Sequence, residues 1–260
     1  MTGEEYDATA PGQAIKRFIK FMMSAVVIAI GSEMGGYVTN VVGWLVEAKS
    51  LLNPDRTATE AVAAFDRQHQ AALRKGLLVI ASWSAFEGCV EDFTKGLMRM
   101  DPNRFEHKQF GLRTVAHGDM TSEDDRNDVY ASIERSVNRS TRGIDRFEEL
   151  FAKADLTGDV LAMIEPGFTN ALAIRNVWAH NAGYADPEFV RTASGLAFAV
   201  GDLVDVDLTH VSDCLTALIT YAMIVANRHR QACGVGPMPM EGKPRDTPIG
   251  RAYVARYPTS

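Results

Sequence analysis

Apolar residues recur every three or four positions along most of this chain, which is the period of an α-helix. The longest such run extends from Thr57 to Met100, and Asp101-Pro102 ends it because proline disfavours helix at the residue before it. A single helix of that length would be unusual, so we predict a break near Lys75-Gly76. The stripe that defines the period consists of Val62, Phe65, His69, Leu73, Leu77, Ile80, Ser84 and Glu87.

Further helical segments are predicted on both sides of this run. They cover residues 15–52, 122–153, 157–164, 168–182 and 209–231. Ser122 and Asp125 have the spacing of a capping box, and Thr209 can cap the last helix. Gly183 follows the helix at 168–182, as glycine often follows a helix end.

The remaining segments predict little regular structure. Residues 1–12 are polar and are expected to form a loose arm, while residues 103–121 predict a short helix or an irregular connection. Apolar and polar residues alternate from Leu196 to Leu208 around Gly201-Asp202, which predicts a small β-hairpin. The segment 234–260 holds five prolines and is expected to be extended or disordered.

Together these elements predict an all-α fold. We expect a bundle of four to five core helices, with an extra N-terminal helix and a β-hairpin inserted before the last helix. Residues 1–55 would form an arm and an apolar helix or helix pair packed on the bundle. Residues 56–233 would form the helical domain and residues 234–260 a proline-rich basic tail.

Composition and charge narrow the function classes. The 260 residues carry a net charge of -6, which argues against a protein that coats nucleic acid by bulk charge but allows a local basic site. The histidines show no metal-ligand spacing, and neither a disulfide framework nor a zinc site is indicated by the cysteines Cys89, Cys214 and Cys233. We therefore expect a protein of the reducing cytoplasm without a metal or cofactor.

One apolar segment raises the question of a membrane. Phe21–Val46 contains a single charged residue, Glu33, and follows the basic residues Lys16, Arg17 and Lys20. A charge near the middle of a span costs about 2.5–3.5 kcal/mol on insertion scales. Polar and glycine residues near Gly35-Gly36 also divide the segment into two short runs. A buried helix or helix pair is therefore favoured, and a membrane anchor is the alternative.

The chemistry of the chain is concentrated in Arg175–Asn181, whose sequence is RNVWAHN. An arginine fork matches two phosphate oxygens, and a histidine can act as general base or acid near neutral pH. Asn176 and His180 are one helical turn apart, but Arg175 lies about 140° around the helix axis from His180. One helix alone would make a loose pair, so the spacing indicates a site shared by two copies. RNA supplies its own 2′-hydroxyl nucleophile, so phosphodiester cleavage here would need no metal.

These residues resemble the R-x4-6-H motif of HEPN domains, including the polar residue that follows the arginine. Ser82-Trp83-Ser84-Ala85-Phe86-Glu87, continuing to Phe93, is similar to the earlier HEPN helix that carries an acidic residue. The likeness covers residues 58–232 and is nearest to the RiboL-PSP or MAE-type group.

The resemblance implies a four- to five-helix bundle that forms a homodimer through its motif helices. It further implies a metal-independent endoribonuclease of a toxin–antitoxin or phage-defence system, with RNA as substrate and an antitoxin or regulatory protein as partner. The products would be 2′,3′-cyclic phosphate and 5′-hydroxyl ends. By this resemblance Arg175, Asn176 and His180 would be catalytic, while the candidate substrate-binding residues are Asn181, Glu87 and Asp92.

Other interpretations stay open. Some HEPN proteins are inactive binding domains, so a non-catalytic dimerisation or nucleotide- or protein-binding module is the alternative function. A row of arginines could contact RNA, although interleaved carboxylates favour an ion-paired face; it consists of Arg126, Arg135, Arg139, Arg142 and Arg146. In the tail, Tyr253 and Tyr257 alternate with arginines, a pattern compatible with stacking on single-stranded bases.

Overall fold

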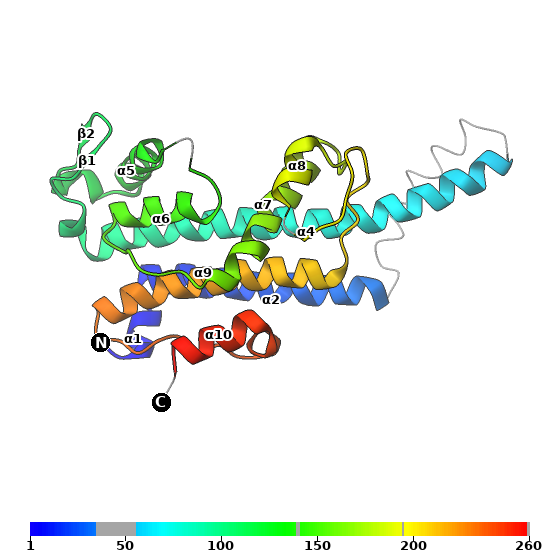
Figure 1. The fold of residues 1–260 in the computed structure, drawn as a ribbon. Helices are drawn as coiled ribbons and strands as arrows, with labels where there is room; N and C mark the ends of the chain where they lie inside the picture. The colour runs from blue at the N-terminus through cyan, green and yellow to red at the C-terminus, as the bar shows by residue number, and fades with distance from the viewer. Residues whose placement is uncertain (35–55, 139–140, 194, 259–260) are drawn as a thin grey trace.

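The computed structural model describes the backbone of residues 1–34, 56–138, 141–193 and 195–258 (Figure 1). Side chains are described in the same ranges except for residues 26–34, 56–67 and 243. The α-helices are α1 (Gly3–Asp7), α2 (Ala10–Met34), α4 (Arg56–Met100), α5 (Glu123–Ser136), α6 (Ile144–Lys153), α7 (Glu165–His180), α8 (Pro187–Thr192), α9 (Leu208–Ala232) and α10 (Pro248–Arg256). Short 3-10 turns occur at η1 (Pro102–Arg104), η2 (His117–Met120), η3 (Ala162–Ile164) and η4 (Lys243–Asp246). The predicted all-α class is confirmed.

Three long helices form the centre of the molecule. Figure 1 shows α2, α4 and α9 running side by side, with α7 crossing them obliquely, and each of these helices packs against α4. Aromatic rings from four helices meet at the crossing, where Phe86 lies with its ring centroid 4.9 Å from Phe147 and 5.4 Å from Phe168. Edge-to-face pairs of this kind add about 0.5–1.5 kcal/mol each beyond the burial of their surface. They hold α7 at a fixed position on α4.

Helix α4 is continuous from Arg56 to Met100, so the predicted break near Lys75-Gly76 is wrong. A methyl group placed on Gly76 would lie 2.5 Å from the ring of Trp178, which shows that this glycine makes room for an indole of α7. The predicted stripe was also displaced, since Leu77 is 52% exposed. The face that is buried carries Ala72, Gly76, Val79, Trp83, Phe86, Val90, Phe93 and Leu97.

The single helix predicted for residues 122–153 is two helices, α5 and α6. The capping box is confirmed, because the Ser122 hydroxyl accepts from the Asp125 backbone N–H and the Asp125 carboxylate accepts from the Ser122 N–H, both at 3.1 Å. Val137 adopts an extended conformation that ends α5, and Gly143 precedes α6 with a φ of 60°. Arg139 lies outside the described residues.

The β-structure lies elsewhere than predicted. Strands β1 (Gln109–Phe110) and β2 (Arg113–Thr114) form an antiparallel pair in the segment expected to be a short helix or an irregular connection. The predicted hairpin at residues 196–208 is wrong, because this segment pairs with the chain that follows α7. Its contacts there are an isolated bridge between Tyr184 and Leu203 and a 2.8 Å bond from the Ala185 N–H to the Asp202 carbonyl.

Both ends of the described chain are folded, contrary to expectation. The predicted loose arm forms α1 and the start of α2, and its Tyr6 is buried. The predicted extended tail forms η4 and α10, with Tyr253 completely buried against α9. The Tyr253 hydroxyl accepts from Asn227 Nδ2 at 2.7 Å and donates to the Met238 carbonyl at 2.8 Å. Proline at the first position of α10 starts this helix without losing a hydrogen bond.

The helix α9 contributes most to the core. Its cap is Asp207, whose carboxylate accepts from the His210 N–H at 2.9 Å, so the predicted cap Thr209 is wrong. Among the described residues, α9 is the one helix long and apolar enough to cross a membrane, and 72% of its apolar window is buried inside the bundle. That burial is what a core helix requires. The predicted break near Gly35-Gly36 lies outside the described residues.

Candidate functional site

Helix α7 carries the Arg–His motif, and its last turn is fixed by the indole of Trp178. The ring lies against Gly76 of α4 and Gly183, and its Nε1–H donates to the Val204 carbonyl at 3.3 Å. Gly183 has a φ of 86° and donates its N–H to the Val177 carbonyl at 3.1 Å, which closes the helix. The glycine predicted at this helix end is confirmed, and the closure defines where the motif side chains leave the backbone.

The three predicted catalytic residues lie together in one chain. Arg175 Nη1 donates to Asn176 Oδ1 at 3.0 Å and lies 3.4 Å from His180 Nε2. The side chain of Arg175 is therefore long enough to reach His180 around the helix, although the two residues leave the axis about 140° apart. The prediction that one helix alone makes only a loose pair underestimated this reach. Because arginine has no acceptor, Nε2 of His180 can only accept in this contact. The contact fits a neutral imidazole with an unprotonated Nε2, which is the form that a general base requires.

A cavity of about 420 Å³ lies beside this motif. Arg175 and Asn176 of α7 form one wall, while Glu87 of α4 lies on another. The connection between α5 and α6 and the start of α6 close the cavity with Arg142 and Arg146. His180 is exposed and lies outside the lining, beyond Arg175 at the end of the helix. The cavity is of the size that small ligands or one nucleotide occupy.

The electrostatics of this cavity are mixed. Three arginines, Arg142, Arg146 and Arg175, face it together with the carboxylates Glu87 and Glu134. Arg146 Nη2 lies 2.9 Å from Glu134 Oε1, an ion pair in which both side chains are partly exposed. Such a pair contributes little stability, about 0–1 kcal/mol, and can open to release its arginine. An anion entering the cavity therefore meets three cations and two carboxylates, and one of these carboxylates, Glu134, pairs with Arg146.

The predicted substrate-binding residues have different locations. Glu87 lies in the cavity beside Arg175, whereas Asp92 forms an ion pair with Arg17 at 3.0 Å and lines a different cavity. Asp92 is about 1.4 helical turns beyond Glu87, so the two carboxylates leave α4 about 140° apart around its axis. Placing Asp92 at the motif was therefore incorrect.

Asn181 supports the backbone near the motif. Its Nδ2 donates to the Asp186 carboxylate, and Asp186 caps α8 by accepting from the Phe189 N–H at 2.7 Å. The side chain is thereby committed to the connection between α7 and α8. Its prediction as a substrate-binding residue is not supported by this geometry.

The residues missed by sequence reasoning are Arg142 and Arg146 as cavity residues. Arg142 lies in the connection before α6 and Arg146 in the first turn of that helix, and the sequence pattern did contain both as part of the arginine row. The prediction of an ion-paired face is confirmed for Arg146. For Arg142, what the sequence could not show is the break after Val137 that turns α6 toward α7.

The described residues contain neither a metal site nor a reactive thiol. No cluster of three or more histidine, cysteine or carboxylate side chains there could hold a metal ion. Burial raises the pKa of the Cys89 and Cys214 thiols to about 12, which keeps both as unreactive thiols. The Arg–His motif and the cavity beside it are the features that bear on function.

The chain matches no protein-family model, no curated protein and no solved structure. The argument for function therefore depends on the residues of the cavity and on the motif.

Proposed function

We propose that this protein is a metal-independent endoribonuclease of the HEPN type. The observation that carries the proposal is the contact of Arg175 with His180 at the edge of a cavity that holds two further arginines. A phosphodiester needs a cation to hold its oxygens and a base to activate the 2′-hydroxyl, and the motif supplies both within 3.4 Å.

In this mechanism Arg175 binds the nonbridging oxygens of the scissile phosphate, and Asn176 orients the guanidinium through their 3.0 Å contact. The phosphate displaces the contact between Arg175 and His180. His180 Nε2 then takes the proton of the 2′-hydroxyl as the O2′–P bond forms. The P–O5′ bond breaks, and the leaving oxygen takes a proton, so the products are a 2′,3′-cyclic phosphate and a 5′-hydroxyl.

The leaving oxygen needs an acid, and the motif has one histidine. We propose that a second copy of the chain supplies it through its own motif helix, so that one histidine acts as base and the other as acid. Exposed apolar side chains near the end of α7 support such an interface, because Tyr184, Val190 and Val200 are 38%, 43% and 60% exposed. A dimer of one wild-type and one His180→Ala chain would then lack either the base or the acid, so we expect it to be far less active than the wild-type dimer.

The test is cleavage of a labelled RNA pool by wild type, Arg175→Ala and Arg135→Ala. Arg135 is an exposed arginine of α5 that does not line the cavity, so it is the matched control. We expect Arg175→Ala to lose activity by about 10³-fold, as enzymes do when a transition-state charge contact is removed. Equal cleavage by Arg175→Ala and Arg135→Ala would contradict the proposal.

A second candidate function follows from the two carboxylates in the cavity. Glu87 and Glu134 oppose a phosphate, and Glu134 already pairs with Arg146. This mixture of arginines and carboxylates is compatible with a non-catalytic dimerisation or nucleotide- or protein-binding module. A folded dimer that cleaves no RNA and does not affect growth on expression would favour it.

The cellular setting belongs to the same proposal. We propose a toxin–antitoxin or phage-defence role in the cytoplasm with an antitoxin as partner, because unrestrained RNA cleavage would harm the cell that makes the enzyme. Growth arrest on expression of wild type, and none with His180→Ala, would support that role.

A further inference from the structure

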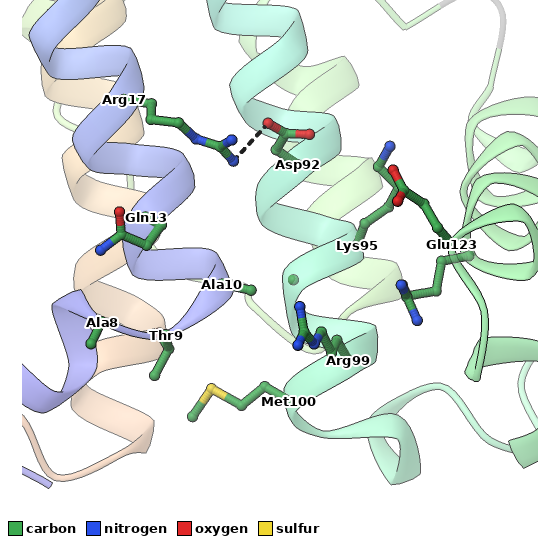
Figure 2. Close-up of a pocket in the computed structure, with 12 residues that line it drawn as sticks. Ala8, Thr9, Ala10, Gln13, Arg17, Asp92, Lys95, Arg99, Met100 and Glu123 are labelled. Carbon is green, nitrogen blue, oxygen red and sulfur yellow. Dashed lines mark hydrogen bonds and ion pairs between the residues drawn. The ribbon is translucent and has the colours of Figure 1, made fainter.

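A second basic cavity lies on the opposite part of α4, where α2 and the start of α5 approach it. Its volume is about 720 Å³. Figure 2 shows Arg17 on α2, Lys95 and Arg99 on α4, and Glu123 at the start of α5 around this space. A neighbouring cavity of about 530 Å³ shares two of its residues, Arg99 and Arg126. Together they form a groove, which we call the α4–α5 groove, about 12–18 Å along α4 from Glu87.

Arg126 is oriented in this groove without being neutralised. Its Nη1 donates to the carbonyls of Met120 and Thr121 at 2.9 and 3.1 Å. Carbonyl oxygens hold the guanidinium in place but carry no net charge, and Arg126 forms no ion pair among the described residues. The cavity also contains two carboxylates, Glu123 and Asp92, of which Asp92 is paired with Arg17 at 3.0 Å. The arginines that serve structure differ, since Arg228 is 8% exposed and pairs with Glu148 at 2.9 Å.

Arg99 is exposed, and within the described residues it forms no hydrogen bond or ion pair. It lies where the two cavities meet, beside Arg126. Lys95 contributes a further amine, which contacts Glu91 and Asn127 at 2.9 Å each. Two guanidinium groups that form no ion pair among the described residues, at the junction of two cavities, are suited to an elongated anion, because each arginine can bind one phosphate by its fork.

We propose that the α4–α5 groove binds a nucleoside polyphosphate, with Arg99 and Arg126 on adjacent phosphates. The volume lies in the range of small-ligand sites, about 300–1,000 Å³. Gln13 on α2 offers its amide oxygen, since its Nε2 donates to the Asp7 carbonyl at 2.6 Å, and Met100 offers an apolar surface for the remainder of the ligand (Figure 2). The site goes beyond the proposed ribonuclease activity, since none of its lining residues belongs to the motif cavity.

The experiment is calorimetric titration of the full chain with inorganic pyrophosphate, with ATP and with a short oligouridylate. We expect pyrophosphate and ATP to bind and to compete for one site. Arg99→Gln with Arg126→Gln should weaken that binding by about 100-fold, because two charge-assisted contacts are lost. The control is Arg74→Gln with Arg135→Gln, which changes the net charge equally on the same two helices outside the groove.

Single variants separate binding from folding. Arg99 has no bonding partner among the described residues, so Arg99→Gln should fold normally and still weaken pyrophosphate binding by about 10-fold. His180→Ala should bind pyrophosphate as wild type does. This expectation holds whether or not the chain cleaves RNA, so the failure of one proposal does not decide the other. Wild type that binds neither pyrophosphate nor ATP, or equal binding by both double variants, would overturn the proposal. Binding of oligouridylate alone would also overturn it and assign the groove to an RNA backbone.

Discussion

Among the described residues, α9 and α7 each bring an arginine and a histidine together, and the two environments differ. His229 and Arg230 of α9 are 1% and 6% exposed, and each is fully engaged. Tyr6 lies 2.8 Å from His229 Nδ1, and Arg230 binds the Asp7 carboxylate at 2.9 Å and the Gly236 carbonyl at 2.7 Å. This cluster, which we call the closed pair, joins the first helix to the last long helix.

The motif on α7, by contrast, is open. His180 is exposed, and its one described polar contact is the 3.4 Å approach of Arg175. A phosphate could replace that contact at little cost, whereas nothing could enter the closed pair without unfolding the N-terminus. The same residue types thus serve stability where their partners are complete and are available for chemistry where they are not.

The largest expected difference between the two places is in stability. Substituting His229→Ala removes a buried ring that packs on Tyr6 and Phe93, and it leaves the Tyr6 hydroxyl without its partner. We expect a loss of about 3 kcal/mol in the free energy of unfolding. His180→Ala should change it by less than about 0.5 kcal/mol. Urea unfolding of both variants measures this, and similar losses would show that the two histidines do not differ as described.

The next effect concerns the packing of the Trp178 ring against Gly76 of α4. Gly76→Ala places a methyl group 2.5 Å from the indole, so we expect about 2 kcal/mol of destabilisation and reduced activity from a displaced α7. Gly88→Ala on the same helix is the control, because nothing lies within 4 Å of its added methyl group. It should stabilise the protein by up to about 1 kcal/mol. Thermal unfolding of both variants distinguishes packing from helix propensity.

The closed pair also predicts a pH dependence of stability. Burial, assisted by the charge of Arg104, lowers the pKa of His229 from 6.5 to about 4. Between these values the unfolded chain binds more protons than the folded protein, so stability falls as the pH decreases through this window. We expect about 2 kcal/mol less stability at pH 5 than at pH 7 from this group. Urea unfolding of His229→Gln should lack this contribution, and an unchanged difference would assign it to other residues.

The smallest effect isolates one hydrogen bond. Tyr6→Phe removes the hydroxyl that contacts His229 but keeps the ring, so a loss of about 1 kcal/mol is expected. Tyr184→Phe is the control, because that hydroxyl belongs to a partly exposed ring near the open motif. Chemical denaturation of the two variants measures the difference, and equal stability would show that the closed pair gains nothing from the hydroxyl.

The helical period was sufficient to predict the class of the fold, and the glycine after the motif helix, Gly183, was predicted at the end of α7. The helical period failed where long-range contacts decide the outcome. Gly76 looked like a helix breaker because the indole that fills its place comes from a residue about 100 positions later. The tail looked extended because the burial of Tyr253 depends on Asn227 and Met238, which local patterns do not reveal.

The candidate site was likewise predictable from the sequence only in part. Arg175, Asn176 and His180 could be grouped from their spacing on one helix, and the structure brings them together. Glu87 could be predicted from the family resemblance, but its distinction from Asp92 required the three-dimensional course of α4 against α2. The α4–α5 groove could not be predicted, since its arginines come from separate helices with no shared pattern.

The measurement that tests the central claim most directly is the analysis of RNA ends produced by wild type and by His180→Ala with EDTA present. Wild type should produce 2′,3′-cyclic phosphate and 5′-hydroxyl ends, and His180→Ala should produce neither. Equal cleavage by both proteins, or products with 3′-hydroxyl ends, would contradict an open arginine–histidine site that cleaves RNA without a metal.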